Sequence, residues 1–282
     1  MTVSVVTDST SDIPRELREE LKIDVVPLTI SFGSEAFRDG VDLTADEFYG
    51  RLPTAKVLPA TSQPPPALFR YAYEHLASRG EVVSVHLSHK LSGTVDTARH
   101  AAEEVAPGRI SVVDTGSVSM GLGLCVLAAA RAARAGGSRE QCVAAAESTA
   151  RRLHVAVALE TLEFLRRGGR IGRAQAFLGG LLRLKPVITV RDGEVVPLTR
   201  ARSRAKALDE LFALVAHAER VTEIAVLHTT TPEDAAQLAE RARAASPDAR
   251  LVVGRFGPAL GVHGGPGMVG IAVVGEDDRD RR

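Results

Sequence analysis

Short apolar runs alternate with helical patterns along the first half of the chain. Apolar runs of about four to eight residues bounded by polar turns indicate buried strands, whereas apolar residues spaced by about three and four indicate helices. The predicted strands lie at residues 3–7, 82–87 and 110–114, with a further apolar run at 25–30, and the predicted helices lie at residues 14–21, 45–51, 66–78, 92–105, 118–135 and 139–152. Strands separated by helices of this length predict right-handed βαβ units and a parallel sheet.

The pattern changes after Arg152. Predicted strands lie at residues 154–159, 187–190, 194–197, 223–228, 251–253 and 271–274, and predicted helices at residues 162–167, 174–182, 204–218 and 232–245. Asp192-Gly193 between two apolar runs is a strong hairpin signal, and a hairpin combined with helical crossovers predicts a mixed sheet. We therefore expect an α/β protein of two domains, an N-terminal α/β/α domain with a parallel sheet at residues 1–154 and a C-terminal mixed-sheet α/β domain at residues 155–282.

The composition is typical of a globular protein and argues against a nucleic-acid partner. Of the 282 residues, 45% are hydrophobic and 25% are charged, a balance that can bury a core. The 35 basic and 35 acidic residues cancel, whereas proteins that neutralise phosphates usually carry a basic excess. Aromatic residues make up 4% of the chain and Trp is absent, which argues against platforms for base stacking.

The sequence shows no pattern that predicts export or membrane insertion. The first residues lack the basic and long apolar regions of a signal peptide, and the apolar stretch at residues 121–130 is too short to span a bilayer. Cys125 and Cys142 form no C-x-x-C pair, so structural zinc and a disulfide framework lack support. We expect a cytoplasmic protein with no integral membrane segment.

A glycine-rich stretch near the C-terminus raises the question of nucleotide binding. Gly265, Gly267 and Gly270 satisfy the pattern G-x-G-x-x-G, but a dinucleotide fingerprint follows a strand and opens a helix. Here a β-branched apolar run at residues 271–274 follows the glycines, and Pro266 removes an N–H that a phosphate would use. We therefore interpret these glycines as shaping a loop rather than binding a dinucleotide.

His263 lies in this stretch, flanked by Gly261, Gly264 and Gly265. Glycine neighbours permit close approach of the backbone to a ligand and conformations with positive φ. The alternative is a histidine on an ordinary surface loop, and these residues alone do not separate the two. Toward an anionic ligand, a neutral imidazole would donate one hydrogen bond and an imidazolium would add charge.

Two segments carry hydroxyl groups suited to a carboxylate or carbonyl. Ser92-Gly93-Thr94 opens a predicted helix, so its hydroxyls and the first N–H groups of the helix suit an oxyanion; the alternative is a plain N-cap serine. Thr61 and Ser62 precede the prolines at residues 64–66, which are expected to hold a rigid extended loop; the alternative is a capped start to the following helix.

The third polar segment, at residues 165–172, contains Arg166, Arg167 and Arg170 beside paired glycines. Such arginines suit a phosphate or an acidic partner surface, and a solvated turn is the alternative. Signatures of a self-sufficient enzyme are missing, because the chain has no G-x-S-x-G, G-x-x-x-x-G-K-[ST] or H-E-x-x-H motif. His86 and His89 have no evident third partner for a metal, so we predict neither catalytic residues nor a metal site.

Six segments together resemble the DegV family. They are VVTDSTSDIP from residue 5, ATSQPPP from 60, LSHKLSGTVDTA from 87, LRRGGRIG from 165, LKPVITVRDGEV from 184 and GPALGVHGGPG from 257. They occur in the family's order and span nearly the whole chain. The resemblance implies two α/β domains with a long-chain fatty acid such as palmitate between or beneath them, and no cofactor. It also implies a binding subunit that presents the acyl carboxylate to a separate ATP-binding fatty-acid kinase protein.

The resemblance also implies roles for particular residues. The residues that would bind the fatty-acid carboxylate are Thr61, Ser62, Ser92, Gly93, Thr94 and His263. Arg170 matches the family's arginine associated with contact to the kinase. Departures from the family's pattern occur near the head group, at Ser88-His89-Lys90 and in TSQPP from residue 61, and also after the hairpin at residues 199–203.

Two other classes of function stay open on the sequence alone. The family is similar to a dihydroxyacetone-binding fold in which a histidine captures a carbonyl, so His263 is a candidate nucleophile of a kinase-like enzyme subunit. A transcriptional or structural protein that merely uses a lipid is the other class.

Overall fold

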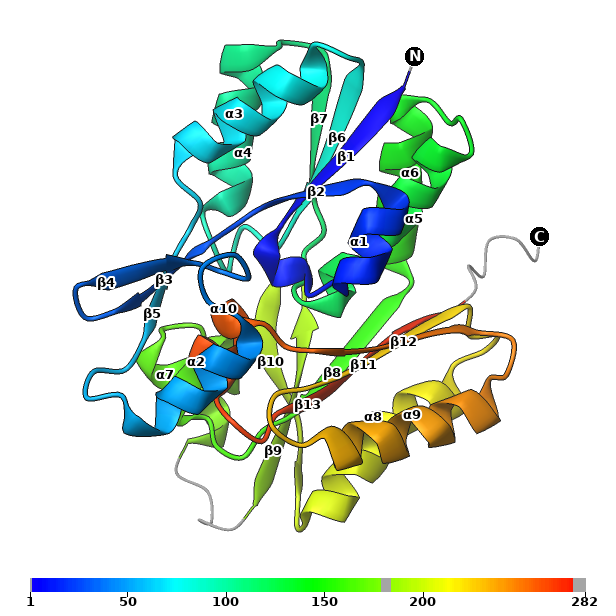
Figure 1. Ribbon diagram of the computed structural model, residues 1–282. Helices are drawn as coiled ribbons and strands as arrows, with labels where there is room; N and C mark the ends of the chain where they lie inside the picture. Colours follow the sequence, from blue (N-terminus) through cyan, green and yellow to red (C-terminus); the bar gives the residue numbers. More distant parts are fainter. Residues whose placement is uncertain (1, 179–183, 276–282) are drawn as a thin grey trace. The chain divides into compact units, whose positions relative to one another are not determined.

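The computed structural model describes residues 2–178 and 184–275 and consists of two compact units (Figure 1). The first unit comprises Met1–Arg151 and Gly257–Ala259, and the second comprises Arg152–Phe256 and Leu260–Arg282. A boundary after residue 154 would divide strand β8 (Leu153–Ala158), whereas the units separate after Arg151. The assignment of residues 257–259 to the first unit has no counterpart in the sequence patterns.

The first unit is built on the expected parallel sheet. Its strands, in the order β2-β1-β6-β7, are β2 (Ile23–Val26), β1 (Val3–Asp8), β6 (Glu81–His86) and β7 (Ile110–Asp114), and all neighbouring pairs are parallel. Figure 1 shows the two helix pairs on opposite sides of this sheet: α3 (Pro66–Ala77) with α4 (Thr94–Val105), and α5 (Met120–Arg134) with α6 (Arg139–Arg151). Helix α1 (Arg15–Leu21) follows the short 3₁₀ helix η1 (Ser9–Ser11). The parallel sheet and its helical crossovers are thus confirmed.

A small antiparallel sheet also belongs to the first unit and was not predicted. Its strands, in the order β4-β3-β5, are β4 (Glu35–Arg38), β3 (Thr29–Phe32) and β5 (Ala60–Ser62). The apolar run at residues 25–30 is therefore two strands in two sheets, separated at Pro27-Leu28, because proline has no N–H with which to continue a ladder. Helix α2 (Ala45–Arg51), begun by a Thr44–Glu47 capping box, and η2 (Leu52–Thr54) lead back to β5.

The second unit has the expected mixed sheet, in the order β10-β9-β8-β13-β11-β12. Besides β8, its strands are β9 (Lys185–Arg191), β10 (Glu194–Ala201), β11 (Glu223–His228), β12 (Arg250–Arg255) and β13 (Val269–Val274). Only the β11–β12 pair is parallel among these described strands. The hairpin between β9 and β10 turns at Asp192 and Gly193, both with positive φ, as the sequence predicts. Helices α8 (Arg204–His217) and α9 (Pro232–Ala245) pack against the apolar side chains of this sheet.

Two features predicted after residue 152 need correction. Residues 258–264 form a helix, α10 (Pro258–Gly264), where the glycine content predicts a loop. Pro258 suits the first turn of a helix, and buried Ala259 and Val262 supply its apolar side. The predicted helix at 174–182 is instead a 3₁₀ helix, η3 (Gly172–Phe177), after α7 (Glu163–Arg167), and residues 179–183 lie outside the described residues.

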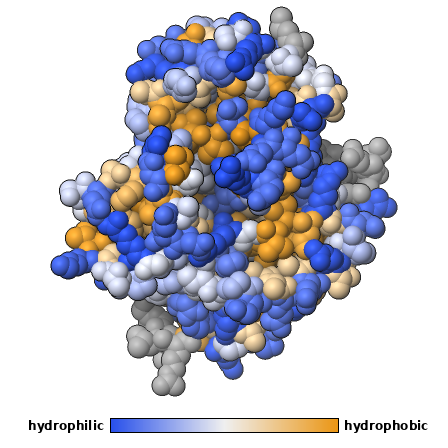
Figure 2. Space-filling model, viewed as in Figure 1, coloured by the Kyte–Doolittle hydropathy of each residue, from blue (hydrophilic) through white to orange (hydrophobic). Residues whose placement is uncertain are grey.

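Within the described stretches, no helix combines the length and apolarity that crossing a membrane would require. Among the described helices α5 is the longest, and most of its residues are buried in the first unit. On the face shown in Figure 2, apolar patches lie among a mostly hydrophilic surface.

Candidate functional site

Asp8, at the end of β1, is the centre of a buried hydrogen-bond network. Its Oδ1 accepts hydrogen bonds from the Thr10 N–H (3.0 Å) and the Thr10 hydroxyl (2.5 Å). Its Oδ2 accepts one from the Leu87 N–H (3.2 Å) and lies 2.9 Å from His86 Nδ1. One carboxylate therefore joins the polar segment that follows β1 to the end of β6, where the segment carrying Ser92 begins.

The network continues along β6. His86 Nε2 lies 2.7 Å from Ser84 Oγ, which is 2.8 Å from the Tyr73 hydroxyl. Ser84 and His86 are two residues apart on a strand and so point to the same face of the sheet. The Tyr73 hydroxyl donates to Ser84 Oγ, and the Ser84 hydroxyl can then donate to His86 Nε2. With Nε2 as the acceptor, the ring proton of His86 is on Nδ1, which donates to Asp8 Oδ2.

The order Ser84, His86, Asp8 is that of a hydrolase triad, but none of the three is exposed to solvent. The Ser84 oxygen is closed off from solvent in this structure, and the network holds the end of β1 against the end of β6. The sequence contains a local signal for part of it, the polar run that begins at Asp8 directly after a buried strand. The pairing with His86, at a sequence separation of 78, is not visible in any motif.

The structure brings the two hydroxyl-bearing segments of the first unit together through Gln63. The Gln63 amide nitrogen donates to Thr97 Oγ1 in α4 at 2.7 Å. A Cβ on Gly93 would lie 2.2 Å from Gln63 Oε1, so only glycine leaves room for this amide. Thr61 and Ser62, which directly precede Gln63, therefore lie beside the start of α4.

Ser92, Gly93 and Thr94 form the start of α4, but Ser92 is not its N-cap. Gly93 occupies that position and no side chain caps the helix there. Ser92 Oγ lies instead 2.9 Å from Thr94 Oγ1. Thr94 is fully buried and Ser92 is partly buried, so the pair lies at the edge of the protein interior. Hydroxyls next to the N–H groups of a helical first turn suit an anionic oxygen.

Thr61 and Ser62 lie on strand β5 rather than in the rigid loop that the prolines predict. Thr61 pairs with Ile30 and Ser62 with Thr29 of the antiparallel strand β3. Thr61 is partly buried and Ser62 is exposed. Neighbouring residues of a strand point to opposite faces, so these two hydroxyls cannot face one carboxylate in the same way.

In the second unit, His263 lies in the last turn of α10 and packs against Gly168. A Cβ on Gly168 would lie 2.2 Å from His263 Nδ1, so glycine permits this contact. The Arg170 guanidinium donates a 2.8 Å hydrogen bond to the Gly168 carbonyl. The structure therefore places the predicted ligand histidine and the predicted partner-contact arginine around the same glycine.

Burial, and secondarily the positive charge of Arg170, lower the pKa of His263 to about 4. Removing an imidazolium from water costs free energy, and a neighbouring cation adds to that cost. The imidazole is therefore neutral at physiological pH in this structure. Of the two possibilities that the sequence leaves open, the neutral hydrogen-bond donor is the one that the structure supports.

The other two arginines named in the segment at residues 165–172, Arg166 and Arg167, form ion pairs with a neighbouring carboxylate. Arg166 donates to Glu163 through Nε at 2.9 Å and through Nη2 at 2.8 Å, and Arg167 forms a further ion pair with the same carboxylate. These contacts hold the pKa of Glu163 well below its usual range, at about 2. Arg170 thus differs from its neighbours, because its guanidinium donates to a backbone carbonyl whereas theirs share the Glu163 carboxylate.

Two buried carboxyl groups, Asp12 and Asp39, lie around Gly257 in the first unit. Asp12 accepts hydrogen bonds from the Gly257 N–H (2.9 Å) and the Ser119 hydroxyl (2.6 Å). Burial raises the pKa of Asp12 well above its usual range and raises that of Asp39 to about 6. Asp12 ends the polar run that begins at Asp8, whereas Asp39 was not singled out from the sequence. Among the described residues, no three His, Cys, Asp or Glu side chains gather as a metal site would require.

The comparisons with known proteins agree with this architecture. Residues 2–276 match the DegV family, which is described as uncharacterised. A DegV domain-containing protein of Streptomyces coelicolor is 40% identical over 276 residues, covering 96% of this chain and 98% of that protein. A solved structure that concerns fatty-acid binding of a DegV family protein from Thermus thermophilus is 38% identical, with a TM-score of 0.91 and coverage of 98% and 100%.

A second solved structure, DegV from Bacillus subtilis, is described as a fatty-acid-binding protein. It is 32% identical to this chain, has a TM-score of 0.88, and the match covers 98% of this chain and 100% of the other. The similarity extends over both units rather than a single motif. This chain is therefore a member of the DegV family.

Proposed function

We propose that this protein binds a long-chain fatty acid such as palmitate and presents its carboxylate to a second protein. The observation that carries the proposal is the 38% identity, over nearly the whole of both chains, to a DegV protein described for fatty-acid binding. A fatty acid has one anionic group and a long apolar chain, so its site needs few polar side chains and a lining made mainly of aliphatic side chains. The few hydroxyls at the start of α4 fit that demand.

Ser92 and Thr94 would bind the head group as a pair. Their oxygens are 2.9 Å apart, so one hydroxyl donates to the other, and the second proton is then available for a carboxylate oxygen. Thr61 and the first N–H groups of α4 would add donors from adjoining segments, with Ser62 and Gly93 shaping the surroundings. A neutral His263 would donate one hydrogen bond, without the cost of burying an ion pair.

The finer proposal is that the second protein is an ATP-binding fatty-acid kinase. In that reaction a carboxylate oxygen forms a bond to the terminal phosphorus of ATP as ADP leaves, giving an acyl phosphate. Hydroxyl ligands would leave a carboxylate oxygen accessible, and Arg170 would contact the kinase or the nucleotide phosphates. The protein itself would then need no cofactor and no catalytic residue of its own.

The binding step is tested by native mass spectrometry of the purified protein, followed by titration with palmitate. Noncovalent C16–C18 acids are expected in the spectrum. Ser92→Ala should weaken palmitate binding by about tenfold or more, since a charge-assisted hydrogen bond contributes roughly 1.5–3 kcal/mol. Ser78→Ala, which removes an exposed hydroxyl at the end of α3, is the matched control and should bind like the wild type.

Two results would contradict the proposal. A covalent triose adduct on His263, with no bound fatty acid, would favour the dihydroxyacetone-kinase-like enzyme instead. Palmitate binding by a Thr61→Ala, Ser92→Ala double variant with unchanged affinity would show that these hydroxyls do not hold the carboxylate.

A further inference from the structure

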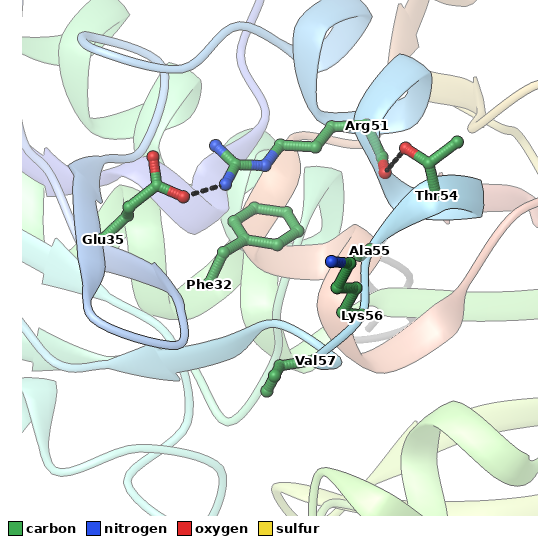
Figure 3. A pocket seen from close by; sticks show the side chains of 7 residues that line it. All are labelled: Phe32, Glu35, Arg51, Thr54, Ala55, Lys56 and Val57. Carbon is green, nitrogen blue, oxygen red and sulfur yellow. Dashed lines mark hydrogen bonds and ion pairs between the residues drawn. The ribbon is translucent and has the colours of Figure 1, made fainter.

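A separate pocket of about 300 Å³ lies in the first unit, between the small sheet and helix α2 (Figure 3). We refer to it as the Arg51 pocket, and its lining includes Phe32, Glu35, Arg51, Thr54, Lys56 and Val57. These residues come from β3, β4, the end of α2, η2 and the segment that leads to β5. None of them belongs to the proposed fatty-acid site, so the pocket is a distinct feature of the fold.

Arg51 is held firmly on one wall of the pocket. Its guanidinium carbon lies 4.4 Å from the centre of the Phe32 ring and 5.4 Å from that of Phe37, and it forms an ion pair with Glu35. The Arg51 carbonyl also accepts a hydrogen bond from the Thr54 hydroxyl, drawn in Figure 3. A guanidinium fixed on aromatic faces loses little side-chain entropy when it binds an anion, because its orientation is already set.

Lys56 supplies a second cation. Its side chain is exposed, and across residues 2–178 and 184–275 it makes no hydrogen bond or ion pair. Figure 3 shows Lys56 on the segment after η2, beside Val57. The lining of the pocket therefore carries two cations, Arg51 and Lys56, and one carboxylate, that of Glu35. The excess positive charge favours an anionic group in the pocket.

The rim beside Lys56 is apolar. Val57 is 59% exposed and Leu58 is 38% exposed, and they are consecutive, whereas the other exposed large apolar side chains of the described residues are scattered along the sequence. Adjacent exposed apolar side chains beside a charged pocket offer a binding partner an apolar contact next to a charged one. A small anion would leave Val57 and Leu58 in water, whereas an occupant that carries an apolar group next to its anionic group would cover them.

We propose that the Arg51 pocket binds a short acidic segment of a partner protein, in which a Glu or Asp is followed by an apolar side chain. The carboxylate lies between Arg51 and Lys56, and the apolar side chain covers Val57 and Leu58. Arginine and aromatic groups together form the strongest contacts of protein interfaces, and charge complementarity sets the register of the bound segment. This docking surface does not depend on the fatty-acid function proposed above.

The experiment follows backbone amide signals of the isotope-labelled full chain during titration with a synthetic peptide, Ac-Gly-Ser-Glu-Leu-Ser-Gly-NH₂. Signals of Arg51, Thr54, Lys56 and Val57 should shift along a one-site binding curve. Replacing Glu by Gln in the peptide should weaken binding by about tenfold, as expected for loss of one charge-assisted interaction, and replacing Leu by Ser should also weaken it.

The matched variants are Lys56→Glu and Lys206→Glu, which change the net charge equally. Lys56→Glu should abolish the shifts, whereas Lys206→Glu, at an exposed position of helix α8, should leave them intact. Three outcomes would overturn the proposal: no shifts at millimolar peptide, equal binding of the Gln peptide, or peptide binding that survives Lys56→Glu. If acetate alone reproduced the shifts, the pocket would bind simple anions and not specifically an acidic segment. Lys56-dependent broadening by phosphatidylglycerol vesicles, without peptide binding, would assign it to a membrane.

Discussion

His263 and Asp39 are both titrating groups whose burial changes stability with pH, and they act in opposite directions. A buried histidine resists protonation, so acid favours the unfolded chain. A buried carboxyl group resists ionisation, so acid favours the folded chain. Each effect can be isolated by a substitution that removes the titration but preserves the shape.

Replacing His263 by Gln should make the protein less sensitive to acid. The folded-state pKa of about 4 lies below the ordinary 6.5, so His263 costs stability as pH falls from about 6.5 to about 4. Between pH 7 and pH 5 the wild type should lose about 2 kcal/mol from this group, and His263→Gln should not. Urea unfolding at both pH values measures the difference, with His75→Gln, on the exposed side of α3, as the control. Equal losses in the wild type and His263→Gln would show that the imidazole is not desolvated.

Replacing Asp39 by Asn should stabilise the protein at neutral pH. Burial raises the pKa of Asp39 from 3.8 to about 6, so keeping it ionised at pH 7 costs up to about 3 kcal/mol. The advantage of Asp39→Asn should shrink as pH falls from 7 to 5, because the wild-type carboxyl group then becomes protonated. Denaturation midpoints at the two pH values test this, and exposed Asp248→Asn should show neither effect. A destabilised Asp39→Asn at pH 7 would mean that the ionised carboxylate makes contacts that outweigh its burial.

Two glycines at the ends of different helices should respond in opposite ways to alanine. Gly50, in α2, is exposed and has open space where alanine would add a methyl group, so Gly50→Ala should stabilise by up to about 1 kcal/mol. Gly168, at the end of α7, has the His263 ring 2.2 Å from the position of such a methyl group. Gly168→Ala should destabilise by about 1–3 kcal/mol and weaken palmitate binding.

The Gly168→Ala effect should depend on His263, which a double-mutant cycle can measure by thermal and urea unfolding. In a His263→Ala background the clash is removed, so Gly168→Ala should then cost much less. Additive losses in the two backgrounds would place the strain elsewhere, for example at the Phe164 carbonyl, 3.2 Å from the added methyl.

The Asp8 carboxylate links β1 to β6, so a neutral isostere should disturb both elements. An Asn side chain offers one acceptor oxygen, and its amide would face either the Thr10 donors or the Leu87 N–H and His86. Asp8→Asn should therefore cost about 1–3 kcal/mol for each donor left unsatisfied, and it should change the ¹⁵N signal of His86 Nδ1. Asp248→Asn again serves as the control. An unchanged His86 signal would show that Asp8 does not fix its tautomer.

Regular elements with strong periodicity were predictable from the sequence, and short ones were not. The bounds of α2, α9, β7 and β11 agree with the sequence patterns. For the two helices, the N-cap Thr44 and the first-turn Pro232 mark where the periodic apolar pattern begins. Strands of three or four residues, such as β5, have too few positions to show a period. Helix α10 is short and glycine-rich, so its formation depends on tertiary burial rather than on local propensity.

In the candidate site, a contact within one motif was predictable from the sequence, whereas contacts between distant segments were not. Ser92 and Thr94 are close in sequence, so their pairing could be anticipated from the motif that contains them. The Gln63–Gly93 contact and the Asp8–His86 link join distant segments, and a single sequence carries no local trace of such contacts. The sequence also assigned His263 and Arg170 to separate roles, whereas both lie around Gly168.

In the proposed function, this protein binds the fatty acid and a second protein transfers the phosphoryl group, so a substitution can abolish the transfer without abolishing the binding. Arg170→Ala should abolish acyl-phosphate formation with a purified ATP-binding fatty-acid kinase protein but retain palmitate binding, because Arg170 is assigned to partner contact. Arg166→Ala is the matched control on the same segment, since Arg166 is engaged by Glu163, and it should retain both activities. Removing the Arg170 charge should also raise the pKa of His263, which a ¹H–¹⁵N titration of the imidazole reports. Loss of palmitate binding in Arg170→Ala, with the fold intact, would place this arginine in the fatty-acid site instead.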